Sequence, residues 1–396
     1  MAAPKRAEVN EVLRIEKARL ADSNKGIRET IKQLDRTNVL ILDAMWKSGP
    51  RNLLEVSRRT RIPFTSVYHR VAKLEAKSNR VATLIPQVAG LGLVRVVVLA
   101  SARPGCEEKV TVALKLPNYS RSVNRCEGLF THFSVQLVPF KHLKLFARYV
   151  KRLQELRLTS KSSIIQTGEY VPNFPDFHYY SPKANQWTFE WAHWLSVLRK
   201  KPTETITDPI GYSILVDRKD MLIIRELEKN ARKSFAELSP ILGISLQGVK
   251  YHYDKKLIQT GIVKHFAFDI LPFPEEISAH HEILLNFKNG AEMNRFYSLI
   301  PELIFVLGTS KALRRNSLLI RTYTLQTQVQ NLFAFLSEIA REGRIEDYSA
   351  IRQISFERDV RMIPYELYDE DDGWSFDIRK YLAELSKLAR STSRSQ

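Results

Sequence analysis

The octapeptide LDRTNVLI at residues 34–41 recurs as VDRKDMLI at residues 216–223, 182 positions further along the chain (35 to 217). Each copy continues with a short helical pattern, a turn and a second amphipathic pattern. A helix-turn-helix has this order, and its second helix packs one face on the core while the other face reads a DNA groove. The repeat therefore predicts two DNA-reading heads in one chain.

The second helix of each copy carries its apolar residues at helical spacing, which places them on one inward face. Copy by copy, these residues are Val67, Val71 and Leu74, then Val249, Tyr253 and Leu257. The last interval is one residue longer in the second copy. We therefore expect the second recognition helix to be slipped or distorted.

The charge of the chain favours an anionic partner. Its 396 residues include 61 Lys and Arg against 43 Asp and Glu, a net charge of +18. Such a balance indicates nucleic acid first and an acidic membrane surface second. No apolar run approaches the roughly 20 residues of a membrane helix, and no hydrophobic segment follows Lys5 and Arg6 as in a secretory signal. We expect a cytoplasmic, nucleoid-associated protein without a membrane partner.

The two cysteines, Cys106 and Cys126, exclude a disulfide framework and a Cys-rich zinc ribbon. A reducing compartment is the simplest interpretation.

Composition and pattern divide the chain into seven segments. They are residues 1–33, a basic N-terminal helical arm; 34–86, a winged helix-turn-helix; 90–172, a ferredoxin-like domain; 173–209, a Trp-anchored helix and linker; 216–268, a second winged helix-turn-helix; 277–360, a second ferredoxin-like domain; and 361–396, a Trp-anchored C-terminal helix and tail. The fold class is α+β, with two winged helix-turn-helix domains each followed by a ferredoxin-like (β-α-β-β-α-β) domain, the result of internal duplication.

Apolar runs predict the individual elements of each ferredoxin-like domain. In the first, strands are expected at 93–100, 123–126, 133–138 and 164–171, and helices at 107–116 and 142–156. In the second, strands are expected at 282–287, 303–307, 317–323 and 349–357, and helices at 291–299 and 329–342. Residues 80–85 are expected to form a wing strand beside the DNA groove. The repeated Trp-Thr/Ser-Phe-acid steps at 187–190 and 374–377 predict an aromatic anchor and helix cap, with a ligand cage as the alternative.

Polar and basic residues off the apolar stripes are the candidate DNA contacts. Hydroxyls near a helix start suit base edges or phosphates, whereas Arg and Lys neutralise phosphates or read guanine. An ordinary solvated charge is the alternative for each residue. The candidates are Arg58, Arg59, Arg61, Thr65, Ser66, Tyr68, His69, Arg70, Lys73 and Arg80 in the first head, and Arg232, Lys233, Gln247, Lys250, Tyr251, His252 and Lys255 in the second.

The sequence shows no motif of catalysis or metal binding. It lacks a phosphate-binding Walker loop, a Gly-x-Gly-x-x-Gly stretch and a His-Glu-x-x-His pair. His280, His281 and Glu282 are adjacent on an expected strand, where neighbouring side chains point to opposite faces. The acidic run 369–372 lacks the spacing of a calcium loop. We therefore expect no catalytic residue, no metal and no cofactor, and a protein that is not an enzyme.

A winged helix-turn-helix that opens with Asp and leads into a β-α-β-β-α-β domain resembles the Lrp/AsnC (feast/famine) transcription regulators, here of archaeal type and duplicated in tandem. The matching residues are Asp35, Leu40, Glu55, Ile62, Val67, Arg70, Val71, Leu74 and Glu75 in the first copy, and Asp217, Leu222, Glu237, Leu238, Gly243, Ile244, Ser245, Val249, Leu257, Gly261 and Ile262 in the second.

Members of that family carry one copy and dimerise through their sheets, so the resemblance implies that this chain is a covalent pseudo-dimer that binds double-stranded DNA. The family's ligand-binding turn has a Gly followed shortly by an Asp. The corresponding stretches, 128–132 and 308–311, have no Asp, so the resemblance does not extend to amino-acid sensing. A homodimer and an unidentified small-molecule effector stay open.

Two alternatives to a sequence-reading regulator remain. One is an architectural, chromatin-type or protein-interaction scaffold without sequence choice. The other is an enzyme, because siroheme decarboxylases resemble the same architecture and a fold does not decide function. A tetrapyrrole pocket does not require a net charge of +18. The charge therefore favours DNA binding over the enzyme.

Overall fold

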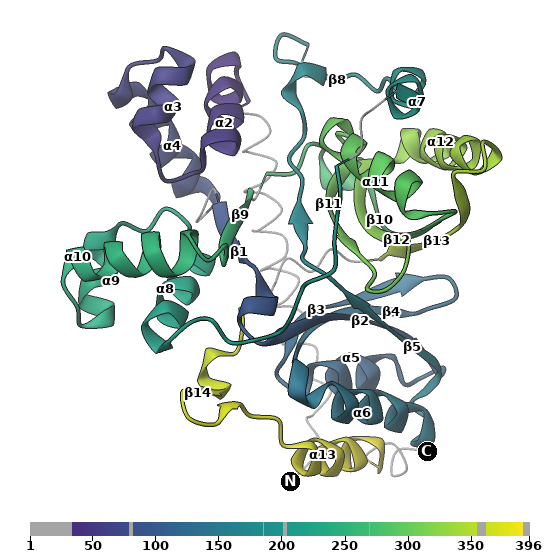
Figure 1. Cartoon of the computed structure of the whole chain (residues 1–396). Helices are drawn as coiled ribbons and strands as arrows, with labels where there is room; N and C mark the ends of the chain where they lie inside the picture. Colours follow the sequence, from purple (N-terminus) through teal and green to yellow (C-terminus); the bar gives the residue numbers. More distant parts are fainter. Residues whose placement is uncertain are drawn as a thin grey trace, which may run out of the picture.

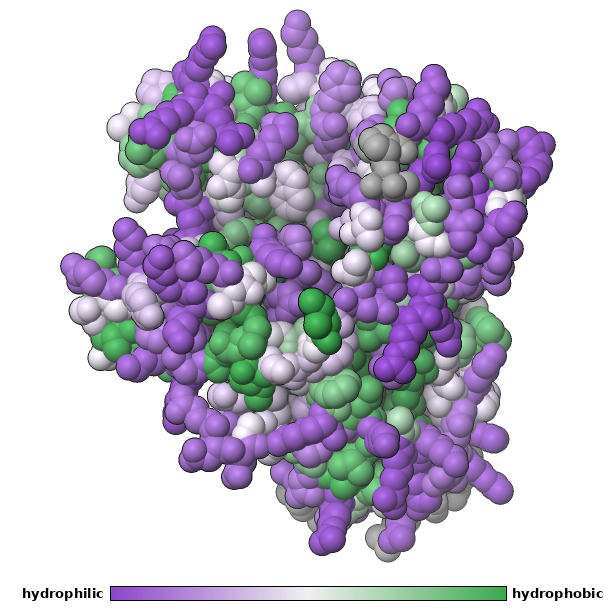
Figure 2. Space-filling view, viewed as in Figure 1, coloured by the Kyte–Doolittle hydropathy of each residue, from purple (hydrophilic) through white to green (hydrophobic). Residues whose placement is uncertain are grey.

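The computed structural model describes residues 34–78, 82–184, 186–200, 204–268, 270–354 and 362–390, so the expected arm at 1–33 lies outside the described residues. Two helical heads lie on one side of the molecule and two sheet units on the other (Figure 1). Hydrophilic residues cover much of the face in Figure 2, and apolar residues gather between the second head and the first sheet unit. Among the described helices, none is both long and apolar enough to span a bilayer.

The first head is a three-helix unit built as the sequence predicts. Its helices are α2 (Arg36–Ser48), α3 (Leu53–Thr60) and α4 (Phe64–Ser78). The Asp35 carboxylate caps α2 by accepting a hydrogen bond from the Asn38 amide at 2.7 Å. The turn before α4 contains Arg61 in the left-handed conformation, with φ of 58°. The apolar stripe of α4 is buried, which confirms its inward orientation.

The second head repeats this order with one change. Its elements are α8 (Arg218–Lys229), α9 (Phe235–Leu242), α10 (Leu246–Tyr251) and the π-helix η4 (His252–Ile258). A π-helix makes wider turns and so accommodates an extra residue. It keeps Val249, Tyr253 and Leu257 in the core despite their longer spacing. The expected distortion of the second recognition helix is thereby confirmed.

The strand after each head pairs with the strand after the other head. Strands β1 (Ala82–Pro86) and β9 (Val263–Phe268) run antiparallel, with Ala82 opposite Phe268. The wing strand expected at 80–85 therefore forms a two-stranded ribbon between the heads (Figure 1). Of that stretch, Arg80 lies outside the described residues.

Each sheet unit has the β-α-β-β-α-β order. The first consists of β2 (Leu93–Ala102), α5 (Glu107–Lys115), β3 (Ser120–Glu127), β4 (His132–Pro139), α6 (Leu143–Glu155) and β5 (Thr159–Thr167). The second consists of β10 (Ser278–Phe287), α11 (Gly290–Leu299), β11 (Val306–Lys311), β12 (Ser317–Leu325), α12 (Val329–Arg341) and β13 (Ile345–Gln353). Together with β6 (Val171–Pro172) they join in the order β5-β2-β4-β3-β13-β10-β12-β11-β6.

Three expected strands are displaced. Strand β5 begins at Thr159 and ends at Thr167, because its polar first half lies at an edge and has no apolar signal. Of the residues expected to complete it, 168–170 form no strand, and Val171 begins β6, which pairs with β11 of the other half. Strand β11 starts at Val306 because residues 303–305 lie in a turn, which is closed by a hydrogen bond from the Val306 amide to the Leu303 carbonyl at 3.0 Å. Strand β13 starts at Ile345, also ahead of the apolar run that predicted it.

The two sheet units pair internally, as the resemblance implies. Strands β3 and β13 meet where Cys126 lies opposite Gln353. The inward faces of the sheets share a small apolar cluster of Val97, Cys126, Phe133, Val135 and Leu319.

An ionic cluster lies buried beside these residues. Arg321 Nε donates to Glu282 Oε1 at 2.6 Å, and Gln353 donates to the same oxygen at 3.1 Å. Arg95 donates to Thr167 and Ser310 at 3.0 and 2.9 Å. Burial lowers the pKa of Arg95 to about 10.

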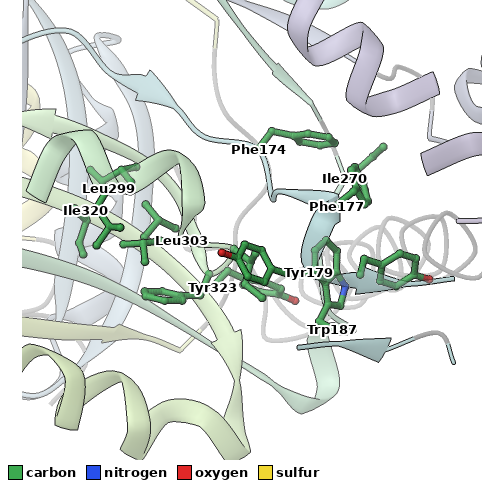
Figure 3. Packing of buried hydrophobic residues seen from close by; sticks show 14 of the residues in the cluster. Phe174, Phe177, Tyr179, Trp187, Ile270, Leu299, Leu303, Ile320 and Tyr323 are labelled. Carbon is green, nitrogen blue, oxygen red and sulfur yellow. The ribbon is translucent and has the colours of Figure 1, made fainter. Parts of the chain in front are cut away.

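Each head packs on the sheet unit of the other half. One core contains the first head, residues 174–198 and the second sheet unit; the other contains the second head, the first sheet unit and the C-terminal helix. Figure 3 shows aromatic residues of the first core, Phe174, Phe177 and Trp187, beside Tyr179 and Tyr323. The halves are thus interleaved.

The two Trp-anchored helices also cross over. Helix α7 (Trp191–Lys200) packs on α11 and α12 of the second unit, and Trp191 Nε1 donates to Gln328 at 2.9 Å. Helix α13 (Ile378–Arg390) packs on α5 and α6 of the first unit. Trp374, which begins the second repeated step, donates to the Leu91 carbonyl at 2.6 Å. Asp377 caps α13 through the Lys380 amide. In the first step, Trp187 is buried against the rings of Tyr180 and Phe273. The tryptophan of each step thus serves as an aromatic anchor.

Candidate nucleic-acid interface

The outer face of α4 is polar and open. Five predicted contacts lie exposed on it: Thr65, Ser66, Tyr68, His69 and Lys73. Between them, the stripe that includes Val67 and Val71 is completely buried. The Tyr68 ring packs near the rings of Phe64 and His69, at 6.4 and 5.8 Å between centroids. Hydroxyls, an imidazole and an ammonium on one helix face have the chemistry to contact base edges and phosphates.

Three arginines flank the start of this helix. Arg58, Arg59 and Arg61 are all exposed on α3 and the turn that follows it. Arg59 forms an ion pair with Glu55 at 2.9 Å, whereas Arg58 lies 4.0 Å from the same carboxylate. The Ser57 hydroxyl donates to the Ile62 carbonyl at 2.6 Å and so braces the turn. Guanidinium groups placed here are suited to hold phosphates on either side of a groove.

Arg70 differs from the expectation, because its guanidinium is held by the start of α2, although the side chain remains 37% exposed. Its Nη1 donates to Asp35 Oδ2 at 2.8 Å and to Asn38 Oδ1 at 3.0 Å. Partial burial raises the pKa of Asp35, but the hydrogen bonds from Arg70 and Asn38 outweigh it and lower that pKa overall. Arg70 thus ties the recognition helix to the first helix of its own head.

The second recognition helix presents a smaller polar face. Gln247, Lys250, Tyr251 and Lys255 are exposed. His252 is turned inward instead, with Nδ1 at 2.7 Å from a carboxylate oxygen of the buried Asp220. Burial raises the pKa of Asp220.

Two further predicted contacts of the second head lie inside the protein rather than toward a groove. Arg232 Nε pairs with Glu75 of the first head at 3.3 Å. Lys233 Nζ pairs with Glu226 at 2.6 Å. Both cations are largely covered, because the α8–α9 loop that carries them packs against the first head. The sequence pattern places basic residues near a helix but does not show which way the loop faces.

The contact between the heads centres on Arg51, which sequence reasoning did not identify. Its Nη1 donates to the carbonyls of Ala231 and Lys233 at 2.9 and 2.7 Å. The guanidinium also lies over the rings of Phe235 and Tyr253, 4.7 and 4.9 Å from their centroids. Together with the β1–β9 ribbon, this clamp holds the two heads as one unit.

Two other groupings were not predicted from the sequence, because each joins distant segments. Asp217, Asp220 and His252 bring three metal-ligand atoms within 4.8 Å of one another. A pocket of about 190 Å³ is lined by residues that include Glu169, His265 and Lys311. Glu169 lies 3.5 Å from His265, and burial raises the pKa of that carboxyl group. The pocket is smaller than the roughly 300–1,000 Å³ that is usual for ligand sites.

Sequence comparison finds a family model for part of the chain and two archaeal relatives. The model of the winged helix-turn-helix DNA-binding family matches residues 216–264. An uncharacterised helix-turn-helix transcriptional regulator of Pyrococcus furiosus is 44% identical over 53 residues, which are 13% of this chain and only 35% of that protein. A second one, from Pyrococcus horikoshii, is 27% identical over 135 residues, which are 33% of this chain and 89% of that protein.

Structural comparison covers nearly the whole chain. The siroheme decarboxylase NirDL, in co-complex with an iron-uroporphyrin III analogue, matches 90% of this chain and 100% of its own, with a TM-score of 0.51 and 11% identity. Its structure without that analogue matches with a TM-score of 0.50 and 10% identity. At such identity the likeness concerns the fold. The chain is thus a tandem duplicate of a winged helix-turn-helix followed by a β-α-β-β-α-β unit, and its fold resembles that of this decarboxylase.

One set of equivalent positions, each pair 182 residues apart, makes the same kind of contact in both heads. Asp35 corresponds to Asp217, Asn38 to Asp220, and Arg70 to His252. In both heads the third residue reaches back from the recognition helix to the start of the first helix. The first head uses an arginine for this contact, and the second uses a histidine.

Proposed function

We propose that this protein is a DNA-binding transcription regulator whose first head makes the principal contact with double-stranded DNA. The observation that carries the proposal is the open polar face of α4, flanked by three exposed arginines at the turn that precedes it. This face combines groups that read bases with groups that neutralise phosphates. The net charge of +18 adds a long-range attraction to the duplex.

The second head supplies an auxiliary contact. Its exposed face, with Lys250, Tyr251 and Lys255, is smaller, and its α8–α9 loop packs on the first head. Because Arg51 and the β1–β9 ribbon join the heads, both engage one duplex as a unit. A rigid pair of heads sets the spacing between the two half-sites.

The test is fluorescence-anisotropy binding to genomic fragments and to random duplex across a salt series. A regulator is expected to prefer a few fragments by about 10³-fold or more, and its affinity is expected to fall steeply with salt. Equal affinity for every duplex would support the architectural scaffold instead. Absence of binding at low salt would contradict both DNA-binding functions.

Removing the three arginines beside α4 is expected to weaken DNA binding about 10- to 10³-fold at moderate salt. In the triple variant Arg58→Ala, Arg59→Ala, Arg61→Ala, the slope of log affinity against log salt is expected to shrink by about 3, since each lost phosphate contact removes about 0.9. The measurement is the same anisotropy series.

A matched control removes three positive charges from the exposed face of α6, through Lys144→Ala, Arg148→Ala and Lys151→Ala. This control changes the net charge equally but lies on the first sheet unit, so it should retain most of the affinity and of the salt slope. If both triple variants lose affinity alike, the effect comes from net charge and the proposed interface is wrong.

Tetrapyrrole binding is a second candidate function, supported by the likeness of fold to a siroheme decarboxylase over 90% of the chain. Titration of the purified protein with the iron-uroporphyrin III analogue, followed by visible absorption, tests it. A saturable change in the Soret band at micromolar protein would favour this function. An unchanged band would leave the regulator as the proposal.

A further inference from the structure

The ribbon between the two heads (Figure 1) has a local two-fold axis. Strands β1 and β9 run antiparallel, and Leu84 lies opposite Phe266, which is its own equivalent 182 residues along the chain (84 to 266). An antiparallel pair in which equivalent residues face each other is related by a two-fold rotation. In a symmetric dimer this symmetry extends to the DNA, because the palindrome of the operator mirrors the two-fold axis of the protein.

The outward residues of the two recognition helices do not share this symmetry. Up to Tyr253, which is the equivalent of Val71, the offset between the helices is 182 residues. The buried Val67 has an identical equivalent, Val249. At the outward positions of residues 64–69, in contrast, every pair differs. These pairs are Phe64 and Leu246, Thr65 and Gln247, Ser66 and Gly248, Tyr68 and Lys250, and His69 and Tyr251.

The outward residues of the first head favour thymine. Phe64 is the first residue of α4 and is 46% exposed although its side chain is apolar. The first residues of a recognition helix are those that contact base edges. In the major groove, the C5 methyl group of thymine is the apolar partner for a Phe ring or a Thr methyl group. Phe64 and the neighbouring exposed Thr65 are both suited to this contact.

The outward residues of the second head favour purines. Gln247 and Lys250 are exposed and lie three residues apart, which places them on the same side of the helix. A Gln amide pairs with N6 and N7 of adenine, and a Lys ammonium donates to O6 and N7 of guanine. Their equivalents in the first head, Thr65 and Tyr68, carry neither an amide nor a positive charge. The two heads therefore present different reading chemistry.

The contact that joins the heads is one-sided as well. Arg51 reaches from the first head to the Ala231 carbonyl and lies over the Phe235 ring of the second. Its equivalent is Lys233 (51 to 233), whose ammonium instead pairs with Glu226 of its own head at 2.6 Å. Because the unlike heads are joined in one arrangement, each half-site has a fixed place relative to the other.

We propose that this protein recognises a non-palindromic DNA site made of two unlike half-sites. The half-site under the first head carries thymine where Phe64 and Thr65 lie. The half-site under the second carries adenine and guanine where Gln247 and Lys250 lie. The backbone of the ribbon is two-fold symmetric, whereas the side chains that face the bases are not. The inference rests on the proposed DNA-binding function and states which class of site that function uses.

The first experiment selects binding sites for the full chain from random duplexes of about 30 base pairs, long enough for half-sites one or two helical turns apart. We expect an enriched motif that differs from its own reverse complement. Replacing either half-site by an inverted copy of the other should weaken binding about tenfold or more, since each mismatched base pair costs about 5- to 150-fold. A palindromic motif would overturn the inference alone. A library enriched in no motif would contradict the proposed regulator itself.

A second selection tests the assignment of the residues. The variant carries the outward residues of the first head on the second recognition helix, through Leu246→Phe, Gln247→Thr, Gly248→Ser, Lys250→Tyr and Tyr251→His. None of these positions is buried, so the fold should be retained, which circular dichroism checks. The selected motif should now carry thymine in both half-sites. A motif that stays as in the parent would show that these residues do not read the bases and would refute the inference.

A third measurement removes one methyl group from the DNA. Deoxyuridine is placed at each thymine of the first half-site in turn. At one position or more, the parent should bind about fourfold more weakly, the effect of one buried methyl group, and Phe64→Ala should lose part or all of this discrimination. The matched control is Phe140→Ala, because Phe140 is 51% exposed but lies just before α6 of the first sheet unit; it should discriminate as the parent does. Equal affinity of the parent for all uracil and thymine duplexes would contradict the thymine contact.

Discussion

Replacing Glu282 by alanine is expected to lower the free energy of unfolding by about 3–5 kcal/mol. Glu282 lies between the sheets and accepts hydrogen bonds from Arg321 at 2.6 Å and from Gln353 at 3.1 Å. Its loss leaves Arg321 and the nearby Arg95 buried without their carboxylate, and an uncompensated buried cation is strongly unfavourable. Urea denaturation followed by circular dichroism measures the change.

Two controls separate burial from charge. Glu282→Gln keeps an acceptor oxygen and nearly the same volume. It should therefore lower the free energy of unfolding by less than the alanine variant does. Glu108 forms an ion pair with Arg125 at 2.8 Å, but its side chain is 86% exposed. Glu108→Ala should therefore cost less than about 1 kcal/mol. Equal losses in the buried and exposed alanine variants would contradict the role given to the buried cluster.

Acidification is expected to destabilise the fold through its buried histidines. Burial, with a contribution from Arg125, lowers the pKa of His132 to about 4, and burial together with Arg352 does the same for His281. Burial also lowers the pKa of His280 well below its ordinary value. The unfolded chain takes up these protons near pH 6.5 and the native protein does not, so this stability is present above pH 6.5 and is lost as the pH falls toward 4. In that window, each histidine lowers the free energy of unfolding by about 1.4 kcal/mol for each pH unit of acidification.

The measurement is the free energy of unfolding by urea at half-unit steps from pH 7 to pH 4.5. His132 lies between the hydroxyls of Thr111 and Thr131, at 3.0 and 2.8 Å. His132→Asn retains a polar group there but removes the titratable imidazole. The slope of the free energy of unfolding against pH should therefore fall by about 1.4 kcal/mol per pH unit, which corresponds to one proton. His281 faces the ring of Phe333 at 5.6 Å, so His281→Phe should do the same. Slopes equal to that of the parent would refute the assignment.

Local patterns in the sequence predicted much of the fold. The spacing of Val67 and Val71 predicted the buried face of the first recognition helix, because a helix repeats every 3.6 residues whatever surrounds it. The extra residue between Val249 and Leu257 predicted a distorted second helix, which is observed as a π-helix. Strand β5 was misplaced at its start, because its polar residues 160–162 lie at an edge and carry no apolar signal.

The candidate site was predicted only in part. The exposed residues of α4 lie on the outer face that helical periodicity assigned to them. Arg70, Arg232 and His252 instead contact carboxylates of neighbouring helices. A basic residue beside a DNA-reading helix has the same local pattern whether it faces solvent or a carboxylate, so the sequence could not separate the two cases.

By itself, then, the sequence determined the duplication, the element order of each half and the apolar face of each recognition helix, since these follow from interactions within a few residues. The tertiary structure alone decided that each head packs on the other half's sheet unit, that the Trp-anchored helices cross over, and that Arg51 clamps the heads together. These contacts join residues far apart in the chain. Such contacts form where apolar faces can be buried against one another and buried charges can be paired at the same time. No local sequence pattern carries that information.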